Sequence, residues 1–266
     1  MLLSPQSLLE EGTKAGVVLG IDTGGPVASL GVVAGGRLAA VATRSSLSHG
    51  FELPSAVEEV LDAAGTRFSE VSAIAVAIGP GSFTGLRVGL SYSKGLASAA
   101  KIKIVGVSSL DALALCAGTQ LSEGASIYPV IDARRGEVYT GLYRFVTVAL
   151  QKVSGDLVVP LGQLAAELAD DAVLVGYSIA QQVCSLAPTE RRCAVLIDDT
   201  RLSLRGSFVA AIGAAKVAWD EADVIATLEP LYLRPPDSAT SFGRLKPGEQ
   251  IDGTPRGRTY PAAPRS

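Results

Sequence analysis

The sequence predicts a two-lobed α/β protein in which each lobe repeats one unit of three strands, a helix, a strand, a helix and a strand. Apolar runs and glycine-containing turns follow that order over residues 17–105. A weaker copy of the same order follows over residues 127–197. With 266 residues, 48% hydrophobic and 18% charged, the chain is long enough for one large or two small cores.

The first unit lies in a lobe that we assign to residues 16–108. Residues 52–64 carry apolar side chains at helical spacing, with Pro54 in the first turn, and predict an amphipathic helix. Residues 84–100 predict a second helix, and Ser108 or Ser109 is expected to cap the helix that follows the last strand of the unit. The predicted strands cover residues 17–21, 27–33, 38–43, 73–78 and 102–105.

The second unit lies in a lobe assigned to residues 109–204, and a helix within residues 205–222 is expected to return to the first lobe. Residues 1–15 form an N-terminal extension. Residues 238–266, rich in Pro, Gly, Ser and Arg, are expected to be disordered. The second unit predicts strands at 127–131, 138–143, 145–153, 172–175 and 194–197 and helices at 161–169 and 179–186.

Composition excludes several classes of protein. A formal charge of −3 argues against a protein that binds nucleic acid through its overall charge. An RNA contact would need a partner protein or a local positively charged patch. Three cysteines without Cys-x-x-Cys spacing (Cys116, Cys184 and Cys193) predict reduced, mostly buried thiols in a cytoplasmic protein. No apolar run is long enough to span a bilayer, and residues 1–16 lack a basic region followed by an apolar one, so we expect neither a membrane span nor a signal peptide.

Residues 79–87, Gly-Pro-Gly-Ser-Phe-Thr-Gly-Leu-Arg, join an apolar strand to a long helix through three glycines. A strand, a glycine turn and a helix can present backbone N–H groups to a phosphate. The spacing, however, matches neither the phosphate loop nor the dinucleotide fingerprint. We therefore favour the interpretation that this segment is a tight turn, which lets the helix pack closely, rather than a phosphate cradle.

The helix that follows carries a stripe of small residues at Gly85, Gly89, Ser93 and Ala97. This spacing leaves one side of the helix almost without side-chain bulk, so that another backbone can approach it. Most other positions are apolar, which indicates a helix buried on most sides. It lies either deep in one core or against another subunit.

The polar residues offer little catalytic machinery. A single histidine, His49, cannot form a His-x-x-x-His metal site, and it has no nucleophile motif beside it, so it is interpreted as part of the start of a helix. Residues 22–24, Asp-Thr-Gly, form a candidate phosphate turn, but the expected second turn is replaced by Asp-Ala-Arg-Arg at 132–135. Residues 134–137 are interpreted as a charged hairpin turn rather than a contact with tRNA or a partner, and the basic residues of the tail as solvated rather than an RNA tether.

Two units of this order resemble the actin, hexokinase and Hsp70 superfamily, with its ribonuclease H-like lobes and ATP between them. Five stretches more specifically resemble the TsaB family, also called YeaZ, over residues 16–237. They are Leu-Gly-Ile-Asp-Thr at 19–23, residues 79–87, Val-Gly-Val-Ser-Ser-Leu at 105–110, Asp-Ala-Arg-Arg-Gly-Glu-Val-Tyr at 132–139 and Leu-Tyr-Leu-Arg-Pro-Pro at 231–236.

The resemblance implies a non-catalytic scaffold and activator that pairs with a TsaD-type transferase, which threonylcarbamoylates N6 of adenosine 37 in tRNA. It also implies association with a TsaE-type ATPase, a homodimer when the chain is alone, contact with tRNA through the complex, and no membrane. No cofactor or metal of its own is expected, although ATP or ADP can lie at the partner interface. The main alternative is a small-molecule kinase or acyl-phosphate enzyme of the same superfamily, and a protease lacks its nucleophile triad or metal pair.

The resemblance and the small stripe together predict two sets of residues. The dimer interface is expected at Leu53, Val57, Thr84, Gly85, Arg87, Val88, Gly89, Tyr92, Ser93, Leu96 and Ala97. A vestigial nucleotide site is expected at Asp22, Thr23, Gly24, Gly79, Gly81 and Ser82.

Overall fold

The computed structural model describes residues 2–45, 49–117, 121–147, 149–196 and 202–234. Residues up to Arg234 form one compact unit with a five-stranded and an eight-stranded sheet. The predicted disordered tail lies outside the described residues and stays a prediction.

The first sheet contains the predicted unit in the predicted order. Its strand order is β4-β3-β2-β5-β6, in which β2, β5 and β6 run parallel and β3 is antiparallel to both of its neighbours. The elements are β2 Val17–Asp22, β3 Val27–Ala34, β4 Arg37–Ser45, α2 His49–Ala63, β5 Val71–Gly79, α3 Phe83–Ala100 and β6 Lys103–Ser108. Helix α2 begins earlier than predicted, at His49 rather than Glu52, so Pro54 lies beyond its first turn.

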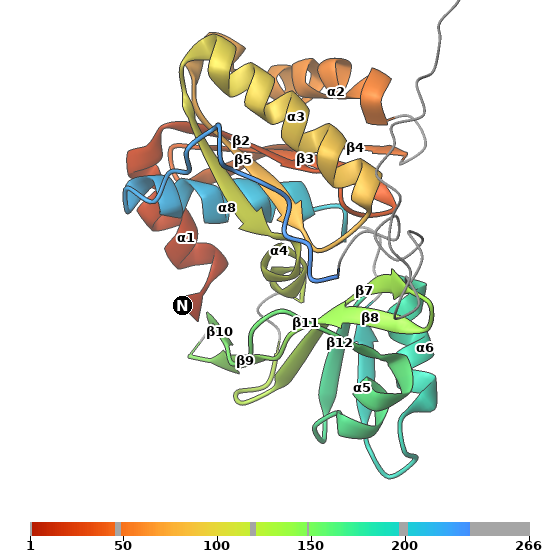
Figure 1. The fold of residues 1–266 in the computed structure, drawn as a ribbon. Helices are drawn as coiled ribbons and strands as arrows, with labels where there is room; N and C mark the ends of the chain where they lie inside the picture. Colours follow the sequence, from red (N-terminus) through yellow and green to blue (C-terminus); the bar gives the residue numbers. More distant parts are fainter. Residues whose placement is uncertain (1, 46–48, 118–120, 148, 197–201, 235–266) are drawn as a thin grey trace, which may run out of the picture. The chain divides into compact units, whose positions relative to one another are not determined.

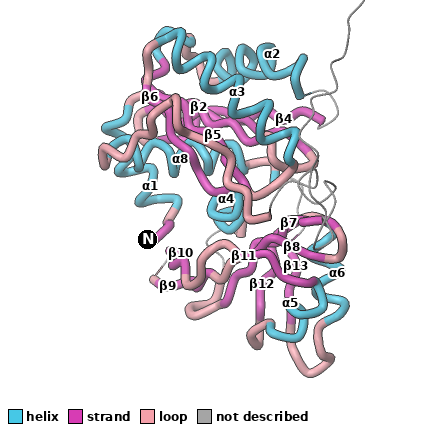
Figure 2. The backbone as a smooth tube through the Cα atoms, in the orientation of Figure 1, coloured by secondary structure: helices cyan, strands magenta, loops and turns pink. Residues whose placement is uncertain are grey.

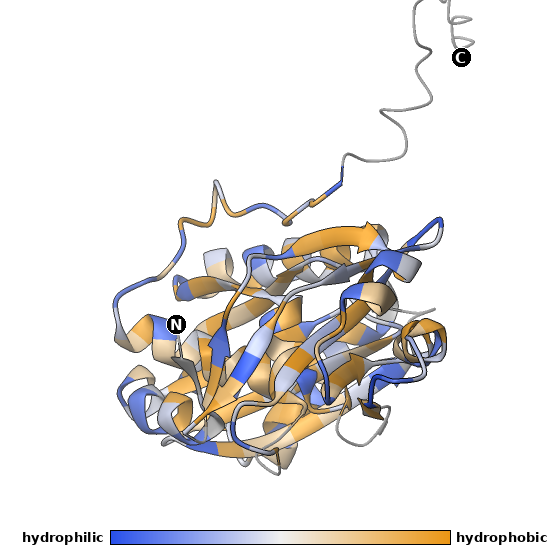
Figure 3. Ribbon diagram, turned by 90° about the horizontal axis from the view of Figure 1, so that it is seen from below, coloured by the Kyte–Doolittle hydropathy of each residue, from blue (hydrophilic) through white to orange (hydrophobic). Residues whose placement is uncertain are grey.

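Helices cover both faces of the first sheet (Figures 1 and 2). Helices α2 and α3 pack on one face, while α8 (Arg205–Ala218) packs on the other, where it is flanked by α1 (Pro5–Gly12). Leu19, Ile21 and Leu30 point towards α2 and α3, while Val18 and Ala75 belong to the core that α8 completes. Figure 3 shows the corresponding concentration of apolar residues along the strands. A sheet covered on both faces explains why its strands are apolar at nearly every position.

The second sheet repeats the topology of the first. Strand β7 pairs antiparallel with β8 and parallel with β12, β8 pairs with β11, and β12 pairs with β13. The elements are α4 Ser109–Leu115, β7 Ser126–Arg134, β8 Glu137–Thr140, β11 Leu157–Pro160, α5 Leu161–Glu167, β12 Ala172–Gly176, α6 Ser178–Leu186 and β13 Cys193–Leu196. The doubled α/β fold predicted from the sequence is thereby confirmed, and Ser108 is the residue that caps α4.

The predicted strand at residues 145–153 is wrong. Strands β9 (Tyr143–Val146) and β10 (Ala149–Lys152) form a hairpin instead, because Thr147 takes a left-handed conformation with φ of 48° that ends the strand. Strand β10 also pairs with β1 (Leu2–Leu3). The third strand of the repeat is therefore β11, and the hairpin is an insertion before it.

Two of the three cysteines do not match the expected reduced thiols. Cys184 on α6 and Cys193 on β13 are joined in a disulfide, with their Cα atoms 6.1 Å apart. The helix and the neighbouring strand bring these residues together although nine positions separate them, which spacing in sequence alone does not reveal. Cys116 is buried, as expected.

Candidate partner interface and closed phosphate turn

The turn between β2 and β3 carries a buried acidic side chain. Asp22 ends β2 and is 1% exposed. Its Oδ1 atom accepts a hydrogen bond from the N–H of Gly24 at 2.8 Å, and its Oδ2 atom lies 3.4 Å from Nε of Arg205. A buried carboxylate needs such partners because burial removes its hydration. The carboxylate of the predicted phosphate turn is therefore engaged within the chain.

Arg205, the first residue of α8, fills the space beside this turn. A Cβ atom on Gly25 would overlap its guanidinium group, whose Nη2 atom donates to the carbonyl of Val27 at 2.7 Å. Burial alone would lower the pKa of Arg205, but the charge of Asp22 contributes to an overall raised pKa, so the group stays charged. Sequence reasoning missed Arg205, although a charged residue beginning an otherwise apolar helix was a signal.

The turn between β5 and α3 closes against the first turn. The N–H of Ser82 donates to the carbonyl of Gly24 at 2.8 Å, and a Cβ atom on Gly81 would lie 2.6 Å from the same oxygen. Gly79 has φ of 117°, and the N–H of Leu231 donates to the carbonyl of Ile78 beside it at 2.7 Å. The two turns of the predicted vestigial site thus bond to each other and to the rest of the chain. This geometry favours the tight turn over the phosphate cradle.

The small stripe of α3 faces the same turn and not a partner. Gly85, Gly89, Ser93 and Ala97 are all buried. A Cβ atom on Gly85 or Gly89 would overlap Thr23, whose hydroxyl donates to the carbonyl of Gly85 at 2.7 Å. The predicted interface is therefore wrong at these four positions, because the chain's own β2–β3 turn approaches Gly85 and Gly89, and Ser93 and Ala97 are buried within the chain.

The opposite side of α3 remains accessible. Among the predicted interface residues, Thr84 and Arg87 are exposed and Val88, Tyr92 and Leu96 are half-buried. Ser91 and Gly95, which the sequence analysis did not select, are exposed on the same helix, and the space beside the Cα atom of Gly95 is open to at least 4 Å. We call Thr84, Val88, Ser91, Tyr92 and Gly95 the outer face of α3. It carries no charged side chain, and each of its residues is three or four positions from another, so they lie on one side of the helix.

Helix α2 lies beside α3, but its predicted interface residues face inward. Leu53 and Val57 are 2% and 4% exposed and pack in the core on the sheet, so the interface prediction is wrong for them too. Burial and then the charge of Glu58 on α2 raise the pKa of Tyr92, which indicates that the two side chains are neighbours. The exposed surface of α2 is acidic and borders the uncharged outer face of α3.

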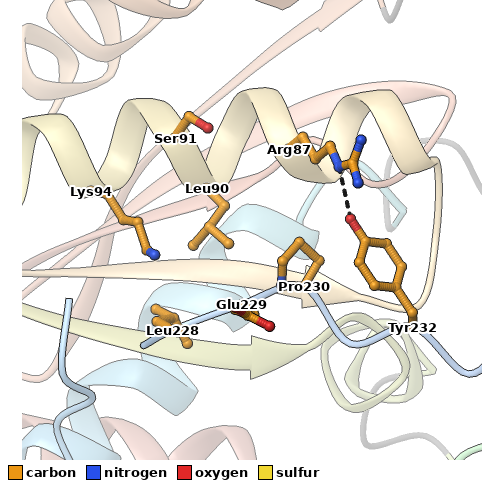
Figure 4. A pocket seen from close by; sticks show the side chains of 8 residues that line it. All are labelled: Arg87, Leu90, Ser91, Lys94, Leu228, Glu229, Pro230 and Tyr232. Atoms are coloured by element: carbon orange, nitrogen blue, oxygen red, sulfur yellow. Dashed lines mark hydrogen bonds between the residues drawn. The ribbon is translucent and has the colours of Figure 1, made fainter. Parts of the chain in front are cut away.

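A pocket of about 350 Å³ lies between α3 and the segment before Arg234. Figure 4 shows Arg87 reaching from α3 to Tyr232, whose hydroxyl accepts a hydrogen bond from Nε of Arg87 at 2.9 Å. The pocket is lined by Arg87, Leu90, Ser91, Lys94, Leu228, Glu229, Pro230 and Tyr232. It contains two cationic side chains and one carboxylate, and no pair typical of general acid–base catalysis.

Across the described ranges, the chain shows neither a metal-binding cluster nor a membrane-spanning helix. In that part of the chain, no group of three or more His, Cys, Asp or Glu side chains is placed to hold a metal ion. None of the helices described there is both long and apolar enough to cross a bilayer.

Comparison with known proteins gives consistent matches. The family model described as TsaD, tRNA N6-adenosine threonylcarbamoyltransferase, matches residues 40–227. The chain is 41% identical to the tRNA threonylcarbamoyladenosine biosynthesis protein TsaB of Bacillus subtilis over 109 residues, which are 41% of this chain and 46% of that protein. It is 32% identical to an uncharacterized protein of Mycobacterium tuberculosis over 225 residues, which are 83% of this chain and 93% of that protein.

A solved structure agrees with these matches. YeaZ from Pseudomonas aeruginosa superposes with a TM-score of 0.65 at 27% identity, covering 82% of this chain and all of that one. The chain spans about half the length of the curated TsaB relatives that it matches. The chain is therefore a member of the TsaB family, within the wider family that the TsaD model describes.

Proposed function

We propose that this chain is a non-catalytic subunit that pairs with a TsaD-type transferase in the threonylcarbamoylation of N6 of adenosine 37 in tRNA. The names of its TsaB relatives support the pathway. The observation that carries the non-catalytic role is the Arg205 guanidinium beside Asp22, because its side chain fills the space that a nucleotide phosphate would need at this turn and pairs with the carboxylate of Asp22.

The outer face of α3 is the surface that we assign to the transferase. Its residues are uncharged and partly apolar, and Ser91 and Gly95 are small enough for a second helix to approach closely. Gly95 offers the closest approach because nothing lies over it. The acidic edge on α2 would then form a polar rim, as expected around an apolar interface.

Finer features of the assembly follow from the same proposal. In the absence of the transferase, a second copy of this chain would use the same outer face to form a homodimer, and the two partners would compete. A TsaE-type ATPase would join the pair of subunits, and ATP or ADP would bind at a partner interface rather than within this chain. Contact with tRNA would be made through the complex.

The assignment is tested by Gly95→Leu, with Gly162→Leu on α5 as the matched control. Both glycines are exposed with open space around them, so each variant should fold as the wild type does. Gly95→Leu should weaken association with the transferase about ten- to a hundredfold by forcing the helices apart, whereas Gly162→Leu should not. Sedimentation of the mixed subunits measures association, and a reconstituted tRNA modification assay measures activity.

If Gly95→Leu and Gly162→Leu associate equally well with the transferase, then the interface does not lie on the outer face of α3. No association of the wild-type chain with the transferase would reject the proposed function itself. The alternative of a small-molecule kinase or acyl-phosphate enzyme gains no support from the site, because both turns that would hold phosphate are closed by contacts within the chain.

A further inference from the structure

Phe83, Arg87 and Tyr232 form a surface group that we call the aromatic–arginine cluster. The guanidinium carbon of Arg87 lies 3.6 Å from the centre of the Phe83 ring. The Nε atom of Arg87 donates to the Tyr232 hydroxyl (Figure 4). The two ring centres are 5.4 Å apart. The arginine therefore holds two rings from distant parts of the sequence in one arrangement.

Core packing does not account for the position of these rings. Phe83 is 40% and Tyr232 38% exposed, whereas α3 is anchored to the fold through its opposite side at Gly85 and Gly89. Ordered aromatic and arginine side chains that stay exposed are typical of binding surfaces. Such rings lose little conformational entropy when a ligand stacks on them.

Positive charge extends from the cluster along α3. Lys94 lies two turns beyond Arg87, and both line the pocket of Figure 4. Glu229 is the carboxylate that lines the same pocket. The pocket therefore has cationic side chains on α3 and an aromatic ring, Tyr232, on the opposite segment.

Positive charge also extends in the other direction, along the end of the described chain. Arg234, which follows Tyr232 and Leu233, donates to the carbonyl of Ala133 at 3.0 Å and pairs with Glu137. These contacts hold it against the β7–β8 turn, which carries Arg134 and Arg135. The Arg134 side chain is 83% exposed, and its Nη1 atom lies 3.4 Å from Oδ2 of Asp132. In the sequence that follows Arg234, Arg and Lys outnumber Asp and Glu.

We propose that the aromatic–arginine cluster and the β7–β8 turn bind a single-stranded segment of RNA. The rings would stack on unpaired bases, and Lys94, Arg134 and Arg135 would neutralise phosphates on either side. This proposal rests on the proposed function and departs from it in one respect, because it gives this chain a direct contact with the RNA substrate. It also replaces the interpretation of residues 134–137 as a solvated charged turn.

The arrangement favours RNA over a protein partner. A strand of RNA alternates flat bases with negative phosphates, and the surface alternates exposed rings with positive side chains. The chain carries a net charge of −3, so RNA could bind at such a local patch and not over the whole surface. Arg87 keeps its planar group stacked directly on the Phe83 ring, and a base can in turn stack on an exposed guanidinium plane.

The test is a titration of a fluorescein-labelled RNA hairpin with an unpaired loop, followed by fluorescence anisotropy. The titrant is the full-length chain, alone and mixed with the transferase. Phe83→Ala and Tyr232→Ala should each weaken RNA binding about tenfold, as expected when one stacked base is lost. Arg87→Lys keeps the charge but removes the planar group, so it should weaken binding with little change in salt dependence. Trp219→Ala, which removes an aromatic residue 41% exposed at the end of α8, is the matched control and should bind as the wild type does.

Two results would overturn the proposal. The first is that the wild-type chain does not bind the RNA, or that Phe83→Ala and Tyr232→Ala bind it as tightly as the wild type does. The second is that the ring variants bind RNA as the wild type does but no longer associate with the transferase, which would show that the cluster contacts a protein. Association is measured in the same samples by sedimentation, so failure of the subunit pairing is seen separately from failure of RNA binding.

Discussion

Asp22 and Arg205 form an ion pair inside the chain, with 3.4 Å between Oδ2 and Nε and with 1% and 4% of their side chains exposed. The pair ties the start of α8 to the end of β2, although these two elements lie near opposite ends of the described chain. It also fills the space beside the turn at residues 22–24, where the sequence predicts a vestigial phosphate site. One contact thereby stabilises the fold and closes the turn.

Arg205→Met is expected to destabilise the protein strongly. It leaves the carboxylate of Asp22 buried without its cation, and breaking a buried pair in this way costs about 3–5 kcal/mol. The free energy of unfolding in urea measures the loss. The double variant Asp22→Asn with Arg205→Met should recover part of it, because no unpaired charge remains. A single variant as stable as the wild type would show that the pair contributes little.

The isolated chain is expected not to bind or hydrolyse ATP. Asp22 is engaged by Gly24 and Arg205, and the N–H of Ser82 is bonded to the carbonyl of Gly24. Calorimetric titration with Mg-ATP and a steady-state ATPase assay check this, with Asp22→Asn as the comparison. Substantial turnover that the substitution abolishes would favour the kinase alternative.

Gly89→Leu is expected to destabilise the fold, in contrast to Gly95→Leu on the same helix. The new side chain would collide with Thr23, and overpacking of this kind typically costs about 1–3 kcal/mol. Thermal unfolding followed by circular dichroism compares the two variants. If Gly89→Leu melts with the wild type and loses only its association, then the small stripe faces a partner after all.

Lys152 is expected to make stability fall at alkaline pH. Its Nζ atom lies 2.9 Å from Asp111 and 2.5 Å from Asp156, and although burial alone would lower its pKa, these two carboxylates contribute to an overall raised pKa. A pKa above that of the unfolded chain means that the stabilisation is complete below about pH 10 and is lost as the pH rises through the folded-state value. Urea midpoints between pH 8 and pH 11 should fall more steeply for the wild type than for Lys152→Met. If the urea midpoints of the wild type and of Lys152→Met fall equally steeply with pH, then Lys152 does not cause the loss of stability.

Most of the fold could be predicted because its signals are local. Alternating apolar runs and glycine turns gave both units, and the helix pattern of residues 52–64 gave α2. The insertion of the β9–β10 hairpin could not be predicted, because Thr147 carries no turn signal and takes its left-handed conformation only in the tertiary context. The pairing of Cys184 with Cys193 likewise depends on how α6 packs beside β13.

The candidate site could be located but not oriented. Small and apolar residues occur on most sides of α3, so the sequence does not show which side packs against the rest of the chain. Thr23 decides the matter by contacting Gly85 and Gly89, and the open side is then the one with Ser91 and Gly95. Arg205 is far from Asp22 in the sequence, and only the folded chain shows that they meet.

Site-specific crosslinking at Ser91 tests the partner interface most directly. A photoreactive benzoylphenylalanine at this exposed position lies in the middle of the outer face of α3, and the same group at the exposed Gln181 on α6 is the control. On irradiation with the TsaD-type transferase, the Ser91 variant should give a covalent adduct with the combined mass of the two subunits, and the Gln181 variant should not. An adduct from Gln181 with none from Ser91 would contradict the assignment of the outer face of α3 to the transferase.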